Sequence, residues 1–254
     1  MGRNSEELFW DLYAKLYDNL SGLLPYREEM REIVHEVECL LASQRGSDDA
    51  TGSEPVLSLL DAACGTGYML DKLSQVTTGV RYVGVDRSKA MLKRASRRVQ
   101  ACRPAKLLLD ADLDGKLPFP DESFDVVSSV NTLYALRDPD AFLAEVRRVL
   151  KPCGTALIVN PWKPKLLPIW REHFATLAEW RDERECLRTV LLLPSFLAIT
   201  AINAVIARRA KGKVYHFLEP GELAHLMQAN GFVITKLKHE IYAGTCCMIV
   251  AQKK

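Results

Sequence analysis

The sequence predicts a doubly wound α/β fold, in which a mostly parallel sheet is covered by helices on both faces. From residue 56 to residue 160, short apolar runs alternate with stretches of helical periodicity. The apolar runs are continuous series of Val, Ile and Leu, as expected of strands buried on both faces. A glycine-containing turn follows the first run directly. Ligands of such sheets bind outside the carboxyl ends of the strands, so we expect the functional site there.

Composition and charge are those of an ordinary globular protein. The chain has 254 residues, of which 48% are hydrophobic and 26% charged, and 34 basic residues nearly balance 32 acidic ones. No charge asymmetry indicates nucleic acid as a partner. The first twenty residues contain no uninterrupted apolar segment of the kind that directs secretion, so we expect a cytoplasmic protein. The seven cysteines include no CxxC pair and no cluster with histidine at zinc spacing, so neither disulfides nor a metal are expected.

Residues 1–55 are expected to form two helices and a linker that cover the functional site. Between residues 5 and 42, apolar side chains recur at helical spacing, with Pro25 near the start of the second run. Residues 42–55 are polar, aperiodic and rich in Ser, Gly and Asp, which is typical of a loop.

Residues 56–160 are expected to form the core of the sheet. The predicted strands are 56–63, 81–86, 105–113, 124–133 and 154–160. The predicted helices are 67–75, 88–100 and 138–150. Ser88 opens the second of these helices, and Pro139 lies in the first turn of the third.

A long insertion and a closing segment complete the predicted order. Residues 161–215 interrupt the alternation with helical sequence, and we interpret them as a lid over the edge of the sheet. Residues 216–254 restore the alternation, beginning with a helix that Gly231 ends. Two strands follow, 233–241 and 244–254, which can pair as an antiparallel hairpin.

The turn after the first strand predicts a ligand site. The strand ends in Asp61, and Gly65 and Gly67 then expose bare backbone and the amides of a helix N-terminus. The next strand ends in Asp86, whose carboxylate can accept two hydrogen bonds from ribose hydroxyls. A dinucleotide site has a third glycine at the position of Leu70, so pyrophosphate binding is disfavoured.

Four motifs occur in order across about residues 56–160, namely LDAACGTG, VGVD, DADLDGKLPFPDESFDVV and VRRVLKPCGTALI. Together they resemble the motif series of class I S-adenosylmethionine-dependent methyltransferases, especially the branch of the ubiquinone and menaquinone biosynthesis methyltransferases. The resemblance implies a Rossmann-like methyltransferase fold, S-adenosylmethionine as the cofactor and methyl transfer as the activity.

The resemblance also implies a set of cofactor-binding residues. These are Tyr17, Asp61, Ala63, Gly65, Gly67, Asp86, Arg87, Met91, Asp112, Leu113 and Asn131. In the family, the glycine turn borders the methionine part of the cofactor, the acid after the second strand holds the ribose, and Asp112 and Leu113 match positions that meet the adenine. Asp110 is an alternative to Asp112, which has the usual spacing to LPF. Tyr17 matches a tyrosine that closes over the cofactor, and burial in a helix packing face explains it equally.

Methyl transfer requires few side chains. It is a displacement at an activated carbon, so positioning and desolvation supply much of the acceleration. An amine acceptor needs only a free lone pair, whereas a hydroxyl or an acidic carbon needs a base. His216, just after the insertion, and Tyr134, just past Asn131, are the candidate catalytic residues, although packing alone also explains each of them.

The uncharged segment 189–207 bears on the acceptor. It meets the length of a membrane span, but Pro194, its polar residues and the immediate return of the chain to the sheet argue against one. We expect either a buried lid or a lid that also contacts an anionic bilayer. The basic residues that would assist such contact are Arg208, Arg209, Lys211 and Lys213. Both alternatives place an apolar wall over the cofactor, which favours a lipophilic acceptor.

Three functional hypotheses follow from the sequence. The first is S-adenosylmethionine-dependent methyl transfer to a small lipophilic acceptor, such as a quinone precursor, a polyketide or a lipid. The second is phospholipid N-methylation at a membrane surface, which the uncharged helix and its basic flank motivate. The third is a non-catalytic module that binds S-adenosylmethionine. The acceptor atom and the oligomeric state stay open.

Overall fold

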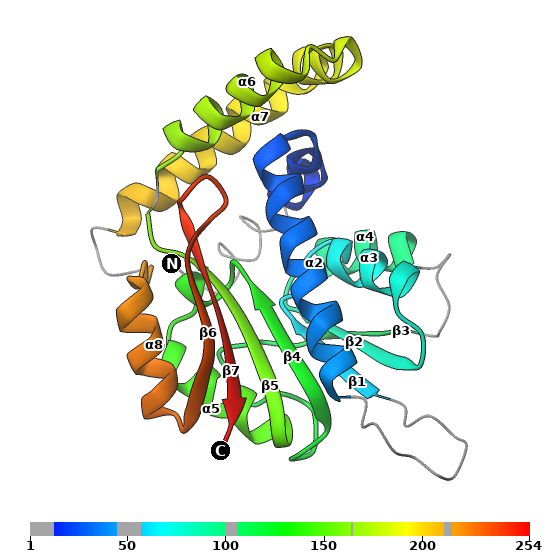
Figure 1. The fold of residues 1–254 in the computed structure, drawn as a ribbon, viewed down its shortest axis with the longest axis vertical. Helices are drawn as coiled ribbons and strands as arrows, with labels where there is room; N and C mark the ends of the chain where they lie inside the picture. Colours follow the sequence, from blue (N-terminus) through cyan, green and yellow to red (C-terminus); the bar gives the residue numbers. More distant parts are fainter. Residues whose placement is uncertain (1–12, 45–56, 100–105, 164, 211–214) are drawn as a thin grey trace.

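The computed structural model describes residues 13–44, 57–99, 106–163, 165–210 and 215–254 (Figure 1). Within these residues, seven strands form one sheet in the order β3-β2-β1-β4-β5-β7-β6. The strands are β1 Leu57–Ala62, β2 Val80–Asp86, β3 Lys106–Asp110, β4 Phe124–Val130, β5 Leu150–Pro161, β6 Phe232–Ile241 and β7 Cys246–Lys253. Strands β1 to β5 pair in parallel, and β7 runs antiparallel between β5 and β6. The mostly parallel sheet with an antiparallel terminal hairpin confirms the predicted fold.

Helices occupy the connections that the sequence predicted. The helical elements are η1 Asp18–Gly22, α2 Leu24–Gln44, α3 Tyr68–Val76, α4 Lys89–Val99, η2 Leu133–Ala135, α5 Pro139–Val149, α6 Leu167–Trp180, α7 Glu183–Ala210 and α8 Pro220–Ala229. Residues 13–17 are helical as well. The loop predicted over residues 42–55 begins later than expected, because α2 continues to Gln44. The start of the first predicted helix and residues 45–55 lie outside the described residues.

Two strands end earlier than predicted. The prediction carried the fourth strand to residue 133, but β4 ends at Val130, because Asn131 has a left-handed backbone with φ of 54°. The third strand was predicted to reach residue 113, but β3 ends at Asp110. Shortly after it, the Asp112 carboxylate accepts a hydrogen bond from the Asp114 amide at 3.2 Å, which favours a turn. Both departures occur where the chain leaves the sheet edge.

Helices cover both faces of the sheet, as its continuous apolar strands require. Leu59 of β1 lies in the hydrophobic cluster formed with α2, α3 and α4, and its neighbour Leu60 lies in the cluster formed with α5 and α8. Helix α2 contributes a stripe of side chains three or four residues apart, namely Tyr26, Met30, Ile33, Val37 and Leu41. Successive side chains of β1 thus point to opposite faces of the sheet, and the apolar stripe of α2 packs on the face that carries Leu59.

The predicted lid is a helical hairpin of α6 and α7, which lies above the tip of β4 in Figure 1. Helix α7 continues through Pro194. Arg27 of α2 makes a bidentate ion pair with Glu185 of α7, at 3.0 and 2.8 Å. His173 of α6 accepts a hydrogen bond from the Leu24 amide through Nδ1 at 3.2 Å, which leaves its Nε2 proton to donate to Thr189 at 3.1 Å. The lid is therefore anchored to the start of α2.

Both ends of this insertion meet at the buried side chain of Asn160, at the end of β5. Its Nδ2 donates to the carbonyl of Pro161 at 3.2 Å and to the carbonyl of His216 at 3.4 Å. Its Oδ1 accepts from the Tyr134 amide at 2.9 Å. The chain therefore leaves the sheet and returns to it at one point.

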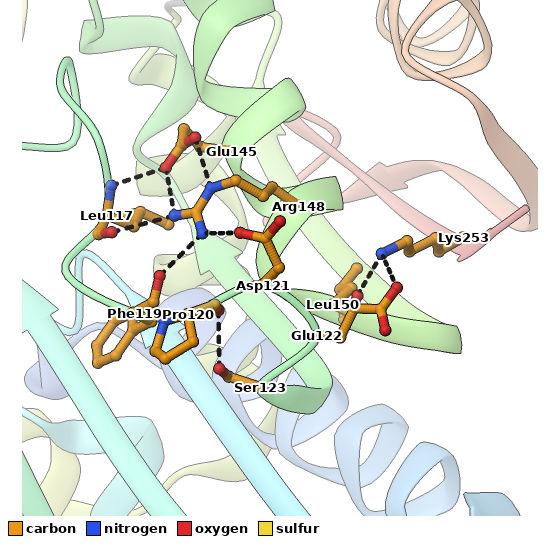
Figure 2. Close-up of polar contacts among 10 residues, drawn as sticks. All are labelled: Leu117, Phe119, Pro120, Asp121, Glu122, Ser123, Glu145, Arg148, Leu150 and Lys253. Atoms are coloured by element: carbon orange, nitrogen blue, oxygen red, sulfur yellow. Dashed lines mark hydrogen bonds and ion pairs between the residues drawn. The ribbon is translucent and has the colours of Figure 1, made fainter.

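Arg148 of α5 fixes the loop before β4 (Figure 2). Its guanidinium donates to the carbonyls of Leu117 and Phe119 at 3.1 and 2.8 Å. It also pairs with Glu145 at 2.8 Å and with Asp121 at 2.7 Å. These ion pairs lower the pKa of both carboxyl groups. One side chain thus binds two carbonyls and one carboxylate of the LPFPDES turn.

Replacing Arg148 with Ala should lower the free energy of unfolding by about 3 kcal/mol, because hydrogen bonds to charged groups contribute about 1.5–3 kcal/mol each. Thermal unfolding measures this change. Arg147→Ala is the control, since its exposed side chain lies on the same helix. Equal melting temperatures for the Arg148 variant and the wild type would contradict the role of this network.

Candidate functional site

A cavity lies at the carboxyl ends of β1, β2 and β4, and we call it the strand-end cavity. It is lined by Tyr13, Tyr17, Ala63, Gly65, Asp86, Arg87, Ser88, Met91, Leu113, Val130, Asn131, Thr132, Ala135 and Leu136. This is the edge at which doubly wound sheets bind ligands. The residues on the wall that the resemblance had implied are Tyr17, Ala63, Gly65, Asp86, Arg87, Met91, Leu113 and Asn131. Asp61, Gly67 and Asp112 lie outside it.

The two glycines of the turn have different surroundings. Gly65 has φ of 53°, and among the described residues a Cβ added there would meet Tyr17 alone, at 3.9 Å. Its bare backbone therefore faces open space in the cavity. Gly67 has φ of 73°, and a Cβ there would come within 3.1 Å of Ala95. The second glycine is thus required for the left-handed start of α3 and for its close packing on α4.

Asp86 is held rigidly at the end of β2. Its side chain is buried, and its two oxygens accept hydrogen bonds from the amides of Gly65 at 2.9 Å and Ser88 at 2.8 Å. Burial raises the pKa of Asp86, while these two amide bonds oppose the rise. A carboxylate oxygen can accept more than one hydrogen bond, so the group can still bind ligand hydroxyls.

Asp61 is a buried acid behind the same cavity. Its Oδ1 accepts a hydrogen bond from Ser128 at 3.3 Å, and burial raises its pKa to about 7. Among the described residues, no basic side chain forms an ion pair with it. A positively charged ligand nearby would stabilise the ionised form of this buried carboxyl group.

The acid after β3 lies beside the strand-end cavity, not on its wall. Asp112 is 3.8 Å from the guanidinium of Arg137, and its neighbour Leu113 lines the cavity. The alternative, Asp110, is half exposed and pairs with Lys89 at 3.8 Å. Of the two acids, Asp112 is the one whose neighbour in the sequence lines the cavity.

A second cavity lies beneath α6 and α7, and we call it the lid cavity. It is lined by Tyr13, Tyr17, Leu20, Tyr26, Asn131, Tyr134, Pro161, Lys163, Lys165, Leu166, Ile169, Asn203, Phe217, Tyr242, Thr245 and Cys246. Tyr13, Tyr17 and Asn131 line both cavities. The two cavities therefore adjoin at these three residues.

Five residues on the wall of the lid cavity are tyrosines, and the other polar residues there are Asn131, Lys163, Lys165, Asn203 and Thr245. Burial raises the pKa of Tyr13 to about 12 and raises the pKa of Tyr17, Tyr26, Tyr134 and Tyr242 as well. These hydroxyls therefore keep their protons at neutral pH and can donate hydrogen bonds to a ligand.

The structure separates the two candidate catalytic residues. Tyr134 lies on the wall of the lid cavity, where its ring stacks on Phe217 with centroids 5.4 Å apart. His216 is absent from the walls of both cavities. Its backbone amide donates to the carbonyl of Tyr134 at 2.7 Å, so the observed contacts of His216 are structural.

The sequence did not identify Glu29, a buried acid next to Asn131. The Asn131 amide donates to Glu29 Oε1 at 3.3 Å, and burial raises the pKa of Glu29 to about 8. A signal was present in the helical periodicity. Glu29 lies three residues after Tyr26 and four before Ile33, on the apolar stripe of α2. A carboxylate at such a position is either paired or functional.

The two cavities offer different chemistry. The strand-end cavity combines bare backbone with buried carboxylates, which suits a ligand with hydroxyls and positive charge. The lid cavity combines aromatic rings with neutral hydroxyls, which suits an apolar molecule with a few polar atoms. Among the described residues, no three His, Cys, Asp or Glu side chains gather as metal ligands.

Comparisons with known proteins identify relatives of the chain. Residues 60–158 match a family model described as a methyltransferase domain. The chain is 31% identical over 207 residues to a demethylmenaquinone methyltransferase of Symbiobacterium thermophilum, covering 77% of this chain and 76% of that relative. It is 30% identical over 166 residues to a ubiquinone/menaquinone biosynthesis C-methyltransferase of Geobacter sulfurreducens, covering 65% of this chain and 60% of that relative.

Solved structures share the fold. A methyltransferase from Aquifex aeolicus that depends on S-adenosylmethionine superposes with a TM-score of 0.57 at 18% identity, over 96% of this chain and 98% of that one. A second such enzyme, from Thermotoga maritima, superposes with a TM-score of 0.59 at 20% identity, over 97% and 98% of the two chains.

Replacing Glu29 with Gln should stabilise the protein increasingly as the pH rises. The unfolded chain loses the Glu29 proton near pH 4.5, whereas the folded protein keeps it to about pH 8. The stability that this proton contributes is full below about pH 4.5 and is lost as the pH rises through 8, by about 1.4 kcal/mol per unit within this window.

Thermal unfolding between pH 5 and pH 8.5 measures this effect as the melting temperature of the variant minus that of the wild type. The difference should grow with pH for Glu29→Gln. It should stay nearly constant for Glu28→Gln, whose side chain is 49% exposed. A constant difference for both variants would contradict the burial of an ionisable Glu29.

Proposed function

The chain belongs to the class I S-adenosylmethionine-dependent methyltransferases, in the branch of the ubiquinone and menaquinone biosynthesis methyltransferases, and from this premise we propose that it methylates a small lipophilic acceptor of the quinone-precursor class. The protein is an enzyme, and S-adenosylmethionine is its cofactor. The bound cofactor supplies an electrophilic methyl group on a positively charged sulfur. This assignment sets aside a purely non-catalytic binding module.

The proposed cofactor site is the strand-end cavity. Asp86 presents a fixed carboxylate with remaining acceptor capacity, which fits the ribose hydroxyls. Gly65 leaves space for the methionine part, and the charge of Asp61 complements a cationic ligand. Arg87, Met91 and Leu113 would flank the adenine, with Asp112 beside them. Tyr17 would close over the cofactor from the N-terminal segment.

The proposed acceptor site is the lid cavity, and its junction with the strand-end cavity at Asn131 is the observation that carries the proposal. An acceptor in the lid cavity would meet the methyl group at that junction. The aromatic wall that includes Tyr134 and Phe217 fits a flat ring, and tyrosine hydroxyls can donate to its oxygens. Relatives named for demethylmenaquinone, for 2-phytyl-1,4-naphthoquinone and for phthiotriol dimycocerosates support an acceptor of lipid character.

We further propose that the outer face of the lid rests on the cytoplasmic leaflet of a membrane, where a quinone precursor resides. The exposed apolar residues of this face are Leu167, Phe174, Trp180, Leu187, Val190, Leu191, Leu193, Leu197 and Val205. The window Glu183–Val205 is long and apolar enough to span a bilayer by length and composition, and 17% of it is buried. The anchoring of α7 to α2 supports an interfacial position over a span.

Basic residues beyond this face could add attraction to anionic lipid. Arg208 is exposed at the end of α7. Arg209 is described only by its backbone, and Lys211 and Lys213 lie outside the described residues. Phospholipid N-methylation at the same surface is the alternative, and the acceptor assay separates the two.

Labelled S-adenosylmethionine should transfer its methyl group to reduced demethylmenaquinone in lipid vesicles and leave phosphatidylethanolamine in the same vesicles unlabelled. Chromatography of the extracted lipids measures both products.

Asp86→Ala should bind the cofactor at least tenfold more weakly in calorimetry, because the ribose loses a charged acceptor worth about 1.5–3 kcal/mol.

The matched control for Asp86→Ala is Glu179→Ala, which removes an exposed acid of α6 outside the strand-end cavity and should leave cofactor binding unchanged. Labelled phosphatidylethanolamine without labelled quinol would reject the quinone-precursor acceptor and support the alternative.

Replacing both Leu187 and Leu191 with Asp should abolish sedimentation with anionic liposomes and leave the melting temperature unchanged. These side chains are 60% and 70% exposed and lie one turn apart on α7, so the charges enter solvent in the free protein and lipid in the bound one. Val233→Asp is the control, because this exposed apolar residue lies on β6. A wild type that sediments with no vesicle composition would reject membrane docking.

A further inference from the structure

Glu29 is an acid of α2 that has no basic partner among the described residues. Its helical neighbours Glu28, Glu32, Glu36 and Glu38 each lie within 4.0 Å of a basic nitrogen. Glu29 is 2% exposed, and its Oε2 makes no hydrogen bond to any described residue. Burying an unpaired acid is costly, and a helix stripe that needs only packing would carry an apolar side chain there. The position therefore calls for a chemical role.

The surroundings of Glu29 connect it to the reaction site. Its Oε1 accepts a hydrogen bond from the Asn131 side chain at 3.3 Å, and Asn131 lines both cavities. The Asn131 oxygen accepts in turn from the Cys246 thiol at 3.5 Å. The rings of Tyr26 and Tyr242, with centroids 6.2 Å apart, line the lid cavity next to these groups. Glu29 itself lines neither cavity, and it lies one hydrogen bond behind the wall residue Asn131.

The other groups at this junction are poor proton acceptors. Burial raises the pKa of Tyr26, Tyr242 and Cys246, so these groups keep their protons at neutral pH. An amide such as Asn131 is not a base. The hydrogen bonds that His216 makes to described residues are those of its backbone, with Tyr134 and Asn160. Glu29, with a pKa near 8, is the group beside the junction that can both take and release a proton close to neutral pH.

We propose that Glu29 takes up the proton of the methyl acceptor, a role that rests on the proposed function. In this step the O–H or acidic C–H bond of the acceptor breaks, and its proton passes through a water molecule at the junction, which takes this proton and gives another to a Glu29 carboxylate oxygen. When a quinol is methylated on its ring carbon, the oxygen pair forms a C=O bond and the ring π electrons attack the methyl group, and the ring C–H proton then leaves for solvent to restore the aromatic ring. In every case one electron pair of the acceptor forms the new bond to the methyl carbon. This bond replaces the carbon–sulfur bond, whose electrons stay on sulfur. The proton then leaves Glu29 for solvent, which restores the carboxylate.

This role defines the class of acceptor. An amine attacks with its own lone pair and needs no carboxylate at the junction, whereas a quinol hydroxyl or an acidic ring carbon must lose a proton. Positive charge brought into the strand-end cavity also favours the ionised form of Glu29, because opposite charges stabilise each other in a poorly solvated site. Cofactor binding should therefore release a proton from Glu29 and prepare it to accept another.

The test compares the full-length wild type with Glu29→Gln and with the control Glu28→Gln, on reduced demethylmenaquinone. Glu29→Gln should lower turnover by about 10²-fold or more. It should keep cofactor affinity within about twofold and should lose the limb of the pH–rate profile that belongs to the base. A ring-substituted quinol with a more acidic hydroxyl should lose less turnover, because it depends less on a base. Glu28→Gln should match the wild type throughout.

A second measurement does not depend on turnover. Calorimetry of S-adenosylmethionine binding at pH 7.5, in buffers with different ionisation enthalpies, should show more proton release for the wild type than for Glu29→Gln. Unchanged turnover, an equal loss for ordinary and acidic quinols, or equal proton release would each overturn the role of Glu29, while methylation of the quinol by the wild type would leave the proposed function intact. A wild type that methylates only amines would overturn both.

Discussion

The arrangement of both cavities depends on the hydrogen-bonded position of Asn131 at the end of β4. Its backbone has positive φ, so the chain changes direction there after β4. Its backbone amide still donates to the Val159 carbonyl of β5 at 2.9 Å, so the residue stays hydrogen-bonded to the sheet. The side chain then bonds Glu29 of α2 and Cys246 of β7. Asparagine tolerates this backbone better than most residues and also supplies a donor and an acceptor. One side chain thereby joins three elements at the point where the two cavities adjoin.

Much of the fold and of the strand-end cavity could be predicted from sequence, because local pattern determines both. Alternating apolar runs specify a parallel sheet, and Gly65 and Asp86 lie at the ends of consecutive strands, where topology makes them neighbours. Gly67 shares the motif for a different reason, since it packs against Ala95. His216 was a candidate because it follows the insertion directly. Its position outside both cavity walls depends on the path of the returning chain, which local pattern does not determine.

The role of Glu29 could not be predicted from local sequence pattern. Glu29 lies 102 residues before Asn131, so no motif connects them, and their contact follows from how α2 crosses the sheet. Only the presence of an acid on an apolar stripe marks it. Such buried acids without counter-charge oppose folding in the free protein and are relieved by a cationic ligand. Binding of the cofactor and stability of the fold are thereby linked.

The bonds that Asn160 makes to Pro161 and His216 bring the two ends of the lid insertion together. A segment whose ends meet can change in length or sequence while the sheet keeps its hydrogen bonds, since loop closure at that point is already satisfied. The ion pair and the hydrogen bond to α2 are then contacts that hold the lid in place, and they lie outside the sheet. A change in the lid would therefore alter the proposed acceptor site and leave the strand ends that line the strand-end cavity in register.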